Sequence, residues 1–260
     1  MSTTETDHIE TSTSGGVRTL RFNRPERKNA ITTAMYDRLT RELEATAGDP
    51  AIRVLVLTGV GETFTSGNDL KDFLDRIEDG SEPAAFRFLR CLPQFPKPLV
   101  AAVNGAAVGI GTTMLLHCDL VYASTEARFI LPFAALGLCP EAASSLLLPR
   151  VAGLQRATEL LMLGEPFDAE RAREVGIVNE VVAVDRLQQR VAERSAAVAA
   201  LPSSSIRATK ALVRHEVLGQ IEETTAREIE VFRRLLASPE AAEAISAFFE
   251  KRAPDFSRFE

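Results

Sequence analysis

The pattern of strands and helices along this chain changes near residue 185, and this change limits the folds that it can adopt. Before that point, apolar runs such as Ile52–Thr58 and Leu99–Val103 indicate strands buried on both faces, and they alternate with helical stretches such as Thr32–Ala47. After it, the apolar spacing indicates helices only, at residues 186–200, 203–217, 221–236 and 239–252. The sequence therefore predicts an α/β core followed by a helical C-terminal subdomain.

The amino-terminal segment, residues 1–14, is polar and rich in Thr and Glu, and we expect it to be a disordered tail. It lacks the basic and apolar regions of a signal peptide. No uninterrupted apolar run reaches the length of a transmembrane helix, so we expect no membrane partner. With 260 residues, of which 45% are hydrophobic, the chain can form one large domain with an appendage, or two modest domains.

The charge pattern bears on possible partners. The formal net charge is -6 and the basic residues are spread along the chain, which argues against a nucleic-acid partner. One compact basic cluster contains Arg24, Arg27 and Lys28. This cluster fits contact with a phosphorylated small molecule, and it fits a solvated loop equally well.

The cysteine and histidine patterns exclude several kinds of site. The three cysteines, Cys91, Cys118 and Cys139, are widely spaced and form no CxxC pair, and the three histidines form no HExxH motif. We therefore expect no metal site and no disulfide framework, and a reducing, cytoplasmic location. The last four residues, Ser257–Glu260, do not form a peroxisomal address.

Two segments carry the strongest chemical signal. Val103–Gly111 reads as an apolar strand that enters a glycine-rich turn and opens a helix, and free backbone N–H groups in such a turn can hold a developing oxyanion. Leu138–Ser145 places one carboxylate, Glu141, in apolar surroundings, where a glutamate can act as a proton shuttle near neutral pH. Together they predict chemistry at a carbon next to a carbonyl.

Several ordered motifs resemble one known family. Phe64–Leu70 resembles the F-S-x-G-x-D-L segment of the crotonase (enoyl-CoA hydratase/isomerase) superfamily, and Asn104–Gly111 resembles the second motif of that family. Asn23-Arg24-Pro25, Ala157–Gly164 and Phe248–Phe256 follow in the expected order, so the resemblance runs from about Val17 to Phe256. It implies an α/β core of repeated ββα turns wound into a spiral, at residues 15–195. It also implies a C-terminal helical region, residues 196–260, that mediates homotrimers, which often pair into hexamers.

The resemblance also implies a substrate and a site. The substrate is a coenzyme A thioester, with no further cofactor, and its carbonyl oxygen accepts hydrogen bonds from the backbone N–H groups of Asn68 and Ile110. Lys28 and Lys251 are expected at the nucleotide phosphates, and Lys251 is expected to reach a neighbouring subunit; surface ion pairs are an even alternative for both. The resemblance implies further substrate contacts at Phe64, Ser66, Leu70, Phe73, Gly109, Thr113, Phe133 and Leu136. For Phe64, Leu70 and Phe73, packing in the core is an equal alternative.

The motif alignment also points to a branch of the family. Hydratases share their work between two glutamates, and Thr113 and Phe133 stand where these would be. Glu141, in L-C-P-E-A-A-S-S, matches the P-E-x-x-S-S segment of the peroxisomal-type 3,2-trans-enoyl-CoA isomerases, in which a single glutamate carries the catalysis. This resemblance implies that Glu141 takes a proton from C2 of a 3-enoyl chain and returns it at C4, and apolar neighbours such as Leu136 and Leu138 would raise its pKa.

Other interpretations remain open at this point. Glu141 also fits an ordinary first-turn residue that favours the helix dipole, and Asp69 fits a helix cap. A hydratase or another acyl-CoA reaction would need a further acid in the pocket, such as Asp72 or Asp75. The third possibility is a non-catalytic member that binds acyl-CoA or a protein partner.

Overall fold

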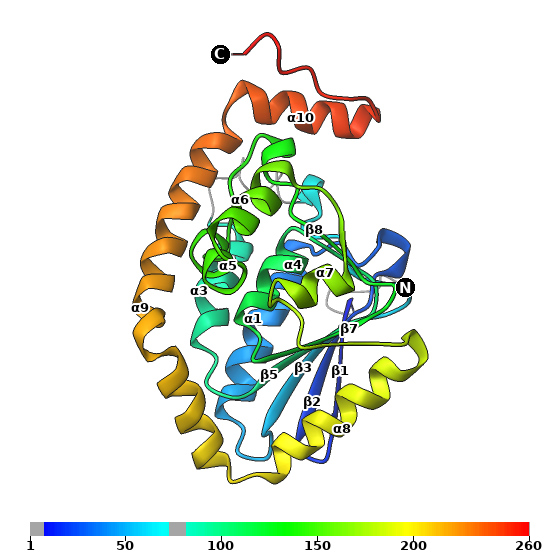
Figure 1. Ribbon diagram of the computed structural model, residues 1–260, viewed down its shortest axis with the longest axis vertical. Helices are drawn as coiled ribbons and strands as arrows, with labels where there is room; N and C mark the ends of the chain where they lie inside the picture. Colours follow the sequence, from blue (N-terminus) through cyan, green and yellow to red (C-terminus); the bar gives the residue numbers. More distant parts are fainter. Residues whose placement is uncertain (1–7, 73–81, 260) are drawn as a thin grey trace.

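The computed structural model describes residues 8–72 and 82–259, and its strands form two sheets (Figure 1). The larger sheet has six strands in the order β1-β2-β3-β5-β7-β10, parallel throughout except for the β1–β2 hairpin. Its strands are β1 (Ile9–Ser14), β2 (Val17–Phe22), β3 (Val54–Gly59), β5 (Leu99–Val103), β7 (Leu120–Ser124) and β10 (Glu180–Val182).

The smaller sheet has the order β4-β6-β8-β9, and its strands are β4 (Thr63–Thr65), β6 (Ala106–Val108), β8 (Arg128–Ile130) and β9 (Phe167–Asp168). Each of β4, β6 and β8 directly follows a strand of the larger sheet, namely β3, β5 and β7. Each of these three turns of the chain therefore adds one strand to each sheet. This arrangement confirms the predicted α/β spiral of ββα turns.

The helices cover both faces of the larger sheet and close the molecule at one end. They are α1 (Thr33–Gly48), α3 (Ala84–Cys91), α4 (Ile110–Thr113), α5 (Ser144–Ala152), α6 (Leu154–Leu163), α7 (Ala169–Glu174), α8 (Leu187–Ala200), α9 (Ser203–Leu236) and α10 (Pro239–Glu250). Short 3-10 turns lie at Pro25–Arg27, Leu92–Gln94, Met114–His117, Ala134–Leu136 and Val184–Arg186. Because both faces are covered, every residue of β3 is buried, as the continuous apolar run predicted.

The α8 helix corrects the predicted boundary between residues 195 and 196. This boundary falls inside α8, and α8 packs on one face of the larger sheet through Leu187, Val191 and Ala199, against Val54 and Val100. The helix therefore belongs to the core. The C-terminal region proper begins with α9.

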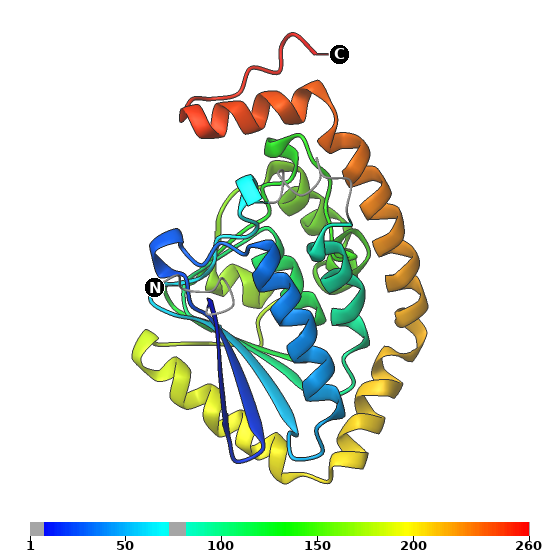
Figure 2. The same ribbon diagram turned by 180° about the vertical axis from the view of Figure 1, so that it is seen from behind.

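The α9 helix is 34 residues long and runs along the whole body of the molecule, with α10 lying across one end (Figures 1 and 2). The sequence predicted two helices here, at 203–217 and 221–236, and this prediction is wrong. Only a short stretch containing Gly219 separates them, and one glycine in a helix costs about 1 kcal/mol, which is too little to end it. Among the described helices, none combines the length and the apolar character that a membrane span needs.

The predicted disordered tail, residues 1–14, is also partly wrong. Residues 9–14 form β1, which pairs antiparallel with β2 from Ile9–Phe22 to Ser14–Val17. After Ile9 the strand is exposed, because it lies at the edge of the sheet, and backbone pairing rather than side-chain burial holds it. Because most of its residues are polar, the hydrophobic pattern of the sequence did not reveal this strand.

Candidate active site

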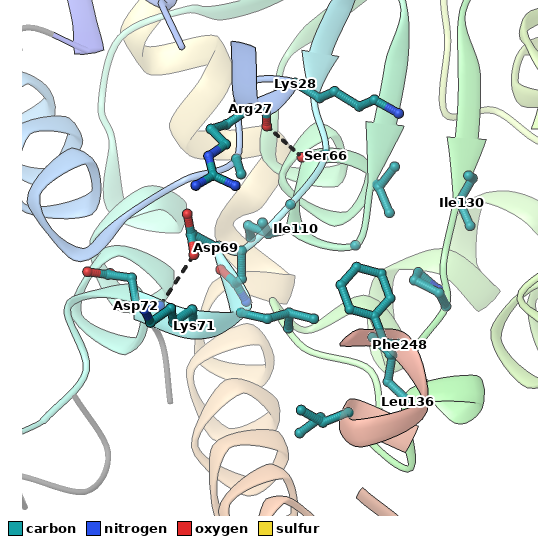
Figure 3. Close-up of a pocket in the computed structure, with 18 of the residues that line it drawn as sticks. Arg27, Lys28, Ser66, Asp69, Lys71, Asp72, Ile110, Ile130, Leu136 and Phe248 are labelled. Carbon is teal, nitrogen blue, oxygen red and sulfur yellow. Dashed lines mark hydrogen bonds between the residues drawn. The ribbon is translucent and has the colours of Figure 1, made fainter. Parts of the chain in front are cut away.

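A cavity of about 930 Å³ opens where the smaller sheet meets the end of α9 and α10. One side is charged, with Arg24, Arg27, Lys28, Lys71, Asp69 and Asp72. The other side is apolar, with Phe133, Leu136, Leu138, Phe232, Leu236, Ile245, Phe248 and Phe249. Figure 3 shows Arg27 and Lys28 at one side of the cavity, Leu136 and Phe248 at the other, and Ile110 between them.

The charged side contains one internal ion pair. Arg24 contacts Asp69 at 2.7 Å, and Asp69 accepts a hydrogen bond from the Asp72 amide, as a helix cap does. Burial raises the pKa of Asp69, but the Arg24 hydrogen bond and charge and the Asp72 amide outweigh it, so that the pKa lies below its ordinary value. Arg27, Lys28 and Lys71 carry the remaining positive charge of this side.

Two backbone amides lie close to the ends of β4 and β6. These strands pair in parallel at Thr65 and Ala107, so the residues three positions further along, Asn68 and Ile110, come to lie side by side at the cavity wall. The residues on either side of Asn68 bond to Ile31: the Ile31 amide donates to the Gly67 carbonyl oxygen, and the Asp69 amide donates to the Ile31 carbonyl oxygen. Ile110 is the first residue of α4, where a helix amide has no partner within the helix. In the described part of the chain, neither amide donates to a protein oxygen. This arrangement suits a pair of donors for an oxyanion.

Gly67 makes this close approach possible. It adopts a left-handed conformation, with φ of +88°, and a Cβ there would lie 2.8 Å from the Val108 carbonyl oxygen. Any larger residue would push the ends of β4 and β6 apart.

Glu141 is 7% exposed and contacts α4, the helix that begins at Ile110. The Thr113 hydroxyl donates to its Oε1 atom at 2.5 Å. Burial raises the pKa of Glu141 to about 8; the Thr113 bond opposes this rise and the charge of Glu228 adds to it. Glu141 does not line the cavity itself, although Leu138, three residues before it, does.

Tyr36 of α1 links the base to the oxyanion wall. Its buried hydroxyl donates to the Asn68 side-chain oxygen. Burial, followed by the nearby charge of Glu141, raises the pKa of Tyr36 well above its ordinary value. Glu141 and Asn68 therefore lie within electrostatic reach of the same phenol.

The segment after Glu141 is held by a residue that the sequence reasoning missed. Ala142 and Ala143 both adopt left-handed conformations, and the Glu228 carboxylate of α9 accepts bonds from the Ala143 and Ser145 amides at 2.6 and 3.0 Å. The spacing of the buried face of α9 (Ile221, Thr225, Glu228, Ile229 and Phe232) was a signal that could have found it.

His117 also contacts the segment that follows Glu141. It lies 1% exposed, with Nε2 at 2.7 Å from the Ala142 carbonyl oxygen, which can only accept, so Nε2 carries the proton. Burial lowers the pKa of His117 to about 4, so the ring is neutral near pH 7.

The structure places the predicted substrate contacts unevenly. Lys28, Ser66, Leu70, Gly109, Phe133 and Leu136 line the cavity. Phe64 does not, because it is fully buried in the core against Phe22, with ring centroids 5.4 Å apart. Thr113 contacts Glu141 rather than the cavity, and Lys251 is exposed away from it at the end of α10. Phe73 and Asp75 lie outside the described residues.

The comparisons with known proteins agree with this architecture. A family model described as enoyl-CoA hydratase/isomerase matches residues 12–258. The chain belongs to the enoyl-CoA hydratase/isomerase family. A crystal structure of an enoyl-CoA hydratase/isomerase from Pseudoalteromonas atlantica T6c is 43% identical, with a TM-score of 0.91, and the match covers 96% of this chain and 100% of that one. The resemblance to the crotonase superfamily is thereby confirmed.

Curated relatives within this family carry different names at similar identity. Enoyl-CoA delta isomerase 2 from Homo sapiens is 38% identical over 245 residues, which are 92% of this chain and 62% of that protein. The chain thus spans less than two thirds of that relative. The 1,2-epoxyphenylacetyl-CoA isomerase of Escherichia coli strain K12 is 36% identical over 93% of this chain and 95% of its own length. Identity at this level shows an acyl-CoA enzyme family without singling out one reaction.

Proposed function

We propose that this chain moves the double bond of a 3-enoyl-CoA thioester to position 2, with Glu141 as the single acid and base. The observation that carries this proposal is the buried Glu141 carboxyl group, with its pKa raised to about 8. It is bonded to Thr113 of α4, the helix whose first residue, Ile110, lines the cavity together with Asn68. Thr113 and Phe133 occupy the places of the two hydratase glutamates, and neither side chain can act as a base near neutral pH.

The proposed steps balance with one proton. Ionised Glu141 removes a proton from C2, and the electron pair of that C–H bond passes into a dienolate whose oxygen accepts hydrogen bonds from the Asn68 and Ile110 amides. Protonated Glu141 then returns the proton at C4, which leaves the double bond between C2 and C3. Each oxyanion donor contributes roughly 3–4 kcal/mol to lowering the barrier.

The cavity supports this substrate class at both ends. Arg27, Lys28 and Lys71 suit the phosphates of coenzyme A, and the apolar side formed by α9 and α10 suits the acyl chain. In the free protein Glu141 faces Thr113, so the reaction requires its carboxyl group to turn toward the cavity when the thioester binds.

Absorbance of the conjugated 2-enoyl thioester tests this proposal. Wild-type protein mixed with a 3-enoyl-CoA should produce the conjugated product, and the Glu141→Gln variant should lose this activity by at least about 1,000-fold, since the amide cannot accept the proton. An exposed counterpart, Glu230→Gln on α9, serves as the matched control and should keep the wild-type rate. An undiminished rate in Glu141→Gln would contradict the proposed role.

A hydratase reaction is the second candidate, because Asp72 lines the cavity. The Thr33 amide donates to Asp72 Oδ2 at 2.5 Å, which ties this carboxylate to the start of α1. The two reactions are separated by supplying a 2-enoyl-CoA: hydration would remove its conjugated absorbance, and Asp72→Asn would abolish that loss. Tight acyl-CoA binding without either reaction would instead support a non-catalytic member.

We also propose that the chain assembles into homotrimers or hexamers, as its family resemblance implies. Large apolar side chains are exposed on α6 and α9, and burial in an interface would explain them: Leu154, Met162, Leu163, Leu212 and Val213. Light scattering on the purified protein tests this proposal, and a monomeric mass at micromolar concentration would contradict it.

A further inference from the structure

The buried face of α9 carries one carboxylate among apolar and small residues. Glu228 is 7% exposed and lies on the same face as Ile221, Ile229 and Phe232. An ionised group in such a position is strongly unfavourable unless other groups bond to it. Its partners therefore show what the residue does.

Among residues 8–72 and 82–259, the Glu228 carboxylate accepts hydrogen bonds only from the segment that follows Glu141. The Ala143 amide donates to Oε2 at 2.6 Å, and the Ser145 amide and hydroxyl donate to Oε1 at 3.0 and 2.5 Å. Both carboxylate oxygens are thus used. These bonds cross 85 and 83 positions of the sequence, from the C-terminal helix to the start of α5.

The segment that Glu228 holds has a conformation that alanine rarely adopts. Ala142 and Ala143 have φ of 60° and 52°, and Ala143 stands at the N-cap of α5, where its side chain offers no oxygen to the helix amides. Such strained conformations persist only when surrounding contacts impose them. Glu228 supplies the missing cap from another helix and imposes this geometry.

We propose that Glu228 is a positioning residue for the isomerase reaction: by holding Ala143 and Ser145, its carboxylate keeps Glu141 buried beside the oxyanion wall. This inference rests on the proposed function. Glu141 directly precedes the strained pair, and its carbonyl oxygen accepts a bond from the Ser144 amide at 3.1 Å, so a shift of residues 143–145 moves Glu141.

The charge of Glu228 also acts on Glu141. Burial is the main cause that raises the pKa of Glu141, the Thr113 bond opposes it, and the charge of Glu228 raises it further. The other titratable groups near this pair are Tyr36 of α1, which interacts with Glu141, and Cys139, which interacts with Glu141, Glu228 and Arg234. The neutral His117 ring contacts Ala142. Loss of the Glu228 charge should therefore lower the pKa of Glu141.

Glu228→Gln tests both effects in the full-length protein, because glutamine replaces one carboxylate oxygen with an NH2 group, which can only donate and would face the amide that this oxygen accepted from. With a 3-enoyl-CoA substrate we expect kcat to fall on the order of 100-fold, as for a displaced catalytic group. We expect KM to stay within about threefold, since Glu228 does not line the cavity. The rising limb of kcat/KM should move to lower pH, which a purely structural role would not cause. The matched control is Glu230→Gln, on the exposed face of α9.

Thermal unfolding as a function of pH reads out Glu141 without any turnover. Its pKa is about 8 in the folded protein and lower in the unfolded chain, so the folded state binds more protons between these values and its stability falls as pH rises from about 4.5 to 8. This contribution is isolated by comparing wild type with Glu141→Gln. When Glu228→Gln is compared with the Glu141→Gln/Glu228→Gln double variant in the same way, the decrease in stability should end at a lower pH.

The outcomes separate this inference from the proposed function. A folded Glu228→Gln variant with wild-type kcat and an unmoved pH limb would overturn the positioning role while leaving the isomerase proposal intact. Where Glu228→Gln does not fold, Ser145→Ala removes one donor to the same carboxylate, and a wild-type kcat in this variant would overturn the role. If wild-type protein isomerises no 3-enoyl-CoA, the unfolding comparison alone decides, and an unchanged pH dependence overturns it.

Discussion

The two walls of the site are built in different ways. The oxyanion wall comes from the register of neighbouring parallel strands: β4 and β6 pair at Thr65 and Ala107, and Asn68 and Ile110 follow at equal distances. The base wall comes from a strained segment after Glu141, held by Glu228 from a helix more than 80 positions away. One wall is therefore defined by backbone pairing between strands, and the other by side-chain contacts from distant parts of the chain, chiefly that of Glu228.

This difference suggests how the family can change its chemistry. The oxyanion wall acts through backbone amides, so it depends on strand register and close packing rather than on side-chain identity. The base wall depends on where one carboxyl group is placed. Under the proposed function, a chain keeps the first wall without the two hydratase glutamates, because a contact such as that of Glu228 supports another acid.

The largest effect is expected from breaking the oxyanion wall. In Gly67→Ala the new Cβ meets the Val108 carbonyl and forces the two amides apart, so kcat/KM should fall roughly 100- to 1,000-fold. Steady-state kinetics with a 3-enoyl-CoA measures this loss. Gly15→Ala is the control, because Gly15 also has a positive φ but nothing lies within 4 Å of the new Cβ. It should lose stability only, and equal losses of activity in the two variants would refute the account of this wall.

A smaller effect is expected from a change that shifts the pKa of Glu141 without moving its side chain. Thr113→Val removes the hydrogen bond that favours ionised Glu141, so the pKa should rise above about 8 and the rising limb of kcat/KM should move to higher pH. At pH 7 the rate should fall about 10-fold, since one hydrogen bond is worth about one pKa unit. This direction is opposite to that expected for Glu228→Gln.

The control for this variant is Thr112→Val. The Thr112 hydroxyl is equally buried and donates to the Ala107 carbonyl at 2.6 Å, so its loss should reduce stability and leave the pH profile in place. If the Thr113→Val profile keeps its position, the hydroxyl does not tune Glu141.

The smallest effect is expected at the charged side of the cavity, which neither wall includes. Lys28→Gln should raise KM about two- to fivefold with kcat unchanged, and added salt should reduce the difference. Lys251→Gln is a close match, because both lysines cap a helix end with a positive φ, and only Lys28 lines the cavity. A raised KM in Lys251→Gln would instead indicate that this residue reaches the site of a neighbouring subunit.

The sequence allowed most of the fold and one wall of the site to be predicted, for a physical reason. Apolar runs and helical spacing are local signals, and they located β5 without error and β3 to within two residues. The short strands β4 and β6 were missed as strands, because three residues leave too little periodicity to detect. Strand β1 was missed because an exposed edge strand need not be apolar.

The contacts around Glu141 could not be predicted from the sequence near it. Glu141 could be singled out by its apolar neighbours, but its hydrogen bond to Thr113 joins residues 28 positions apart and Glu228 lies farther away still. Phe64 was expected at the substrate, yet its ring packs edge-on against Phe22. Whether an aromatic residue faces a core or a cavity depends on the other side of the fold, which the sequence near it does not contain.

A crystal structure with an unreactive acyl-CoA analogue tests the central claim most directly, since it shows which acid lies beside the reacting carbons. We expect the thioester oxygen within about 3 Å of the Asn68 and Ile110 nitrogens. We also expect a Glu141 oxygen, turned away from Thr113, within about 3.5 Å of C2 and in reach of C4. A complex in which Glu141 stays behind the wall while Asp72 or another acid approaches C2 would contradict the account.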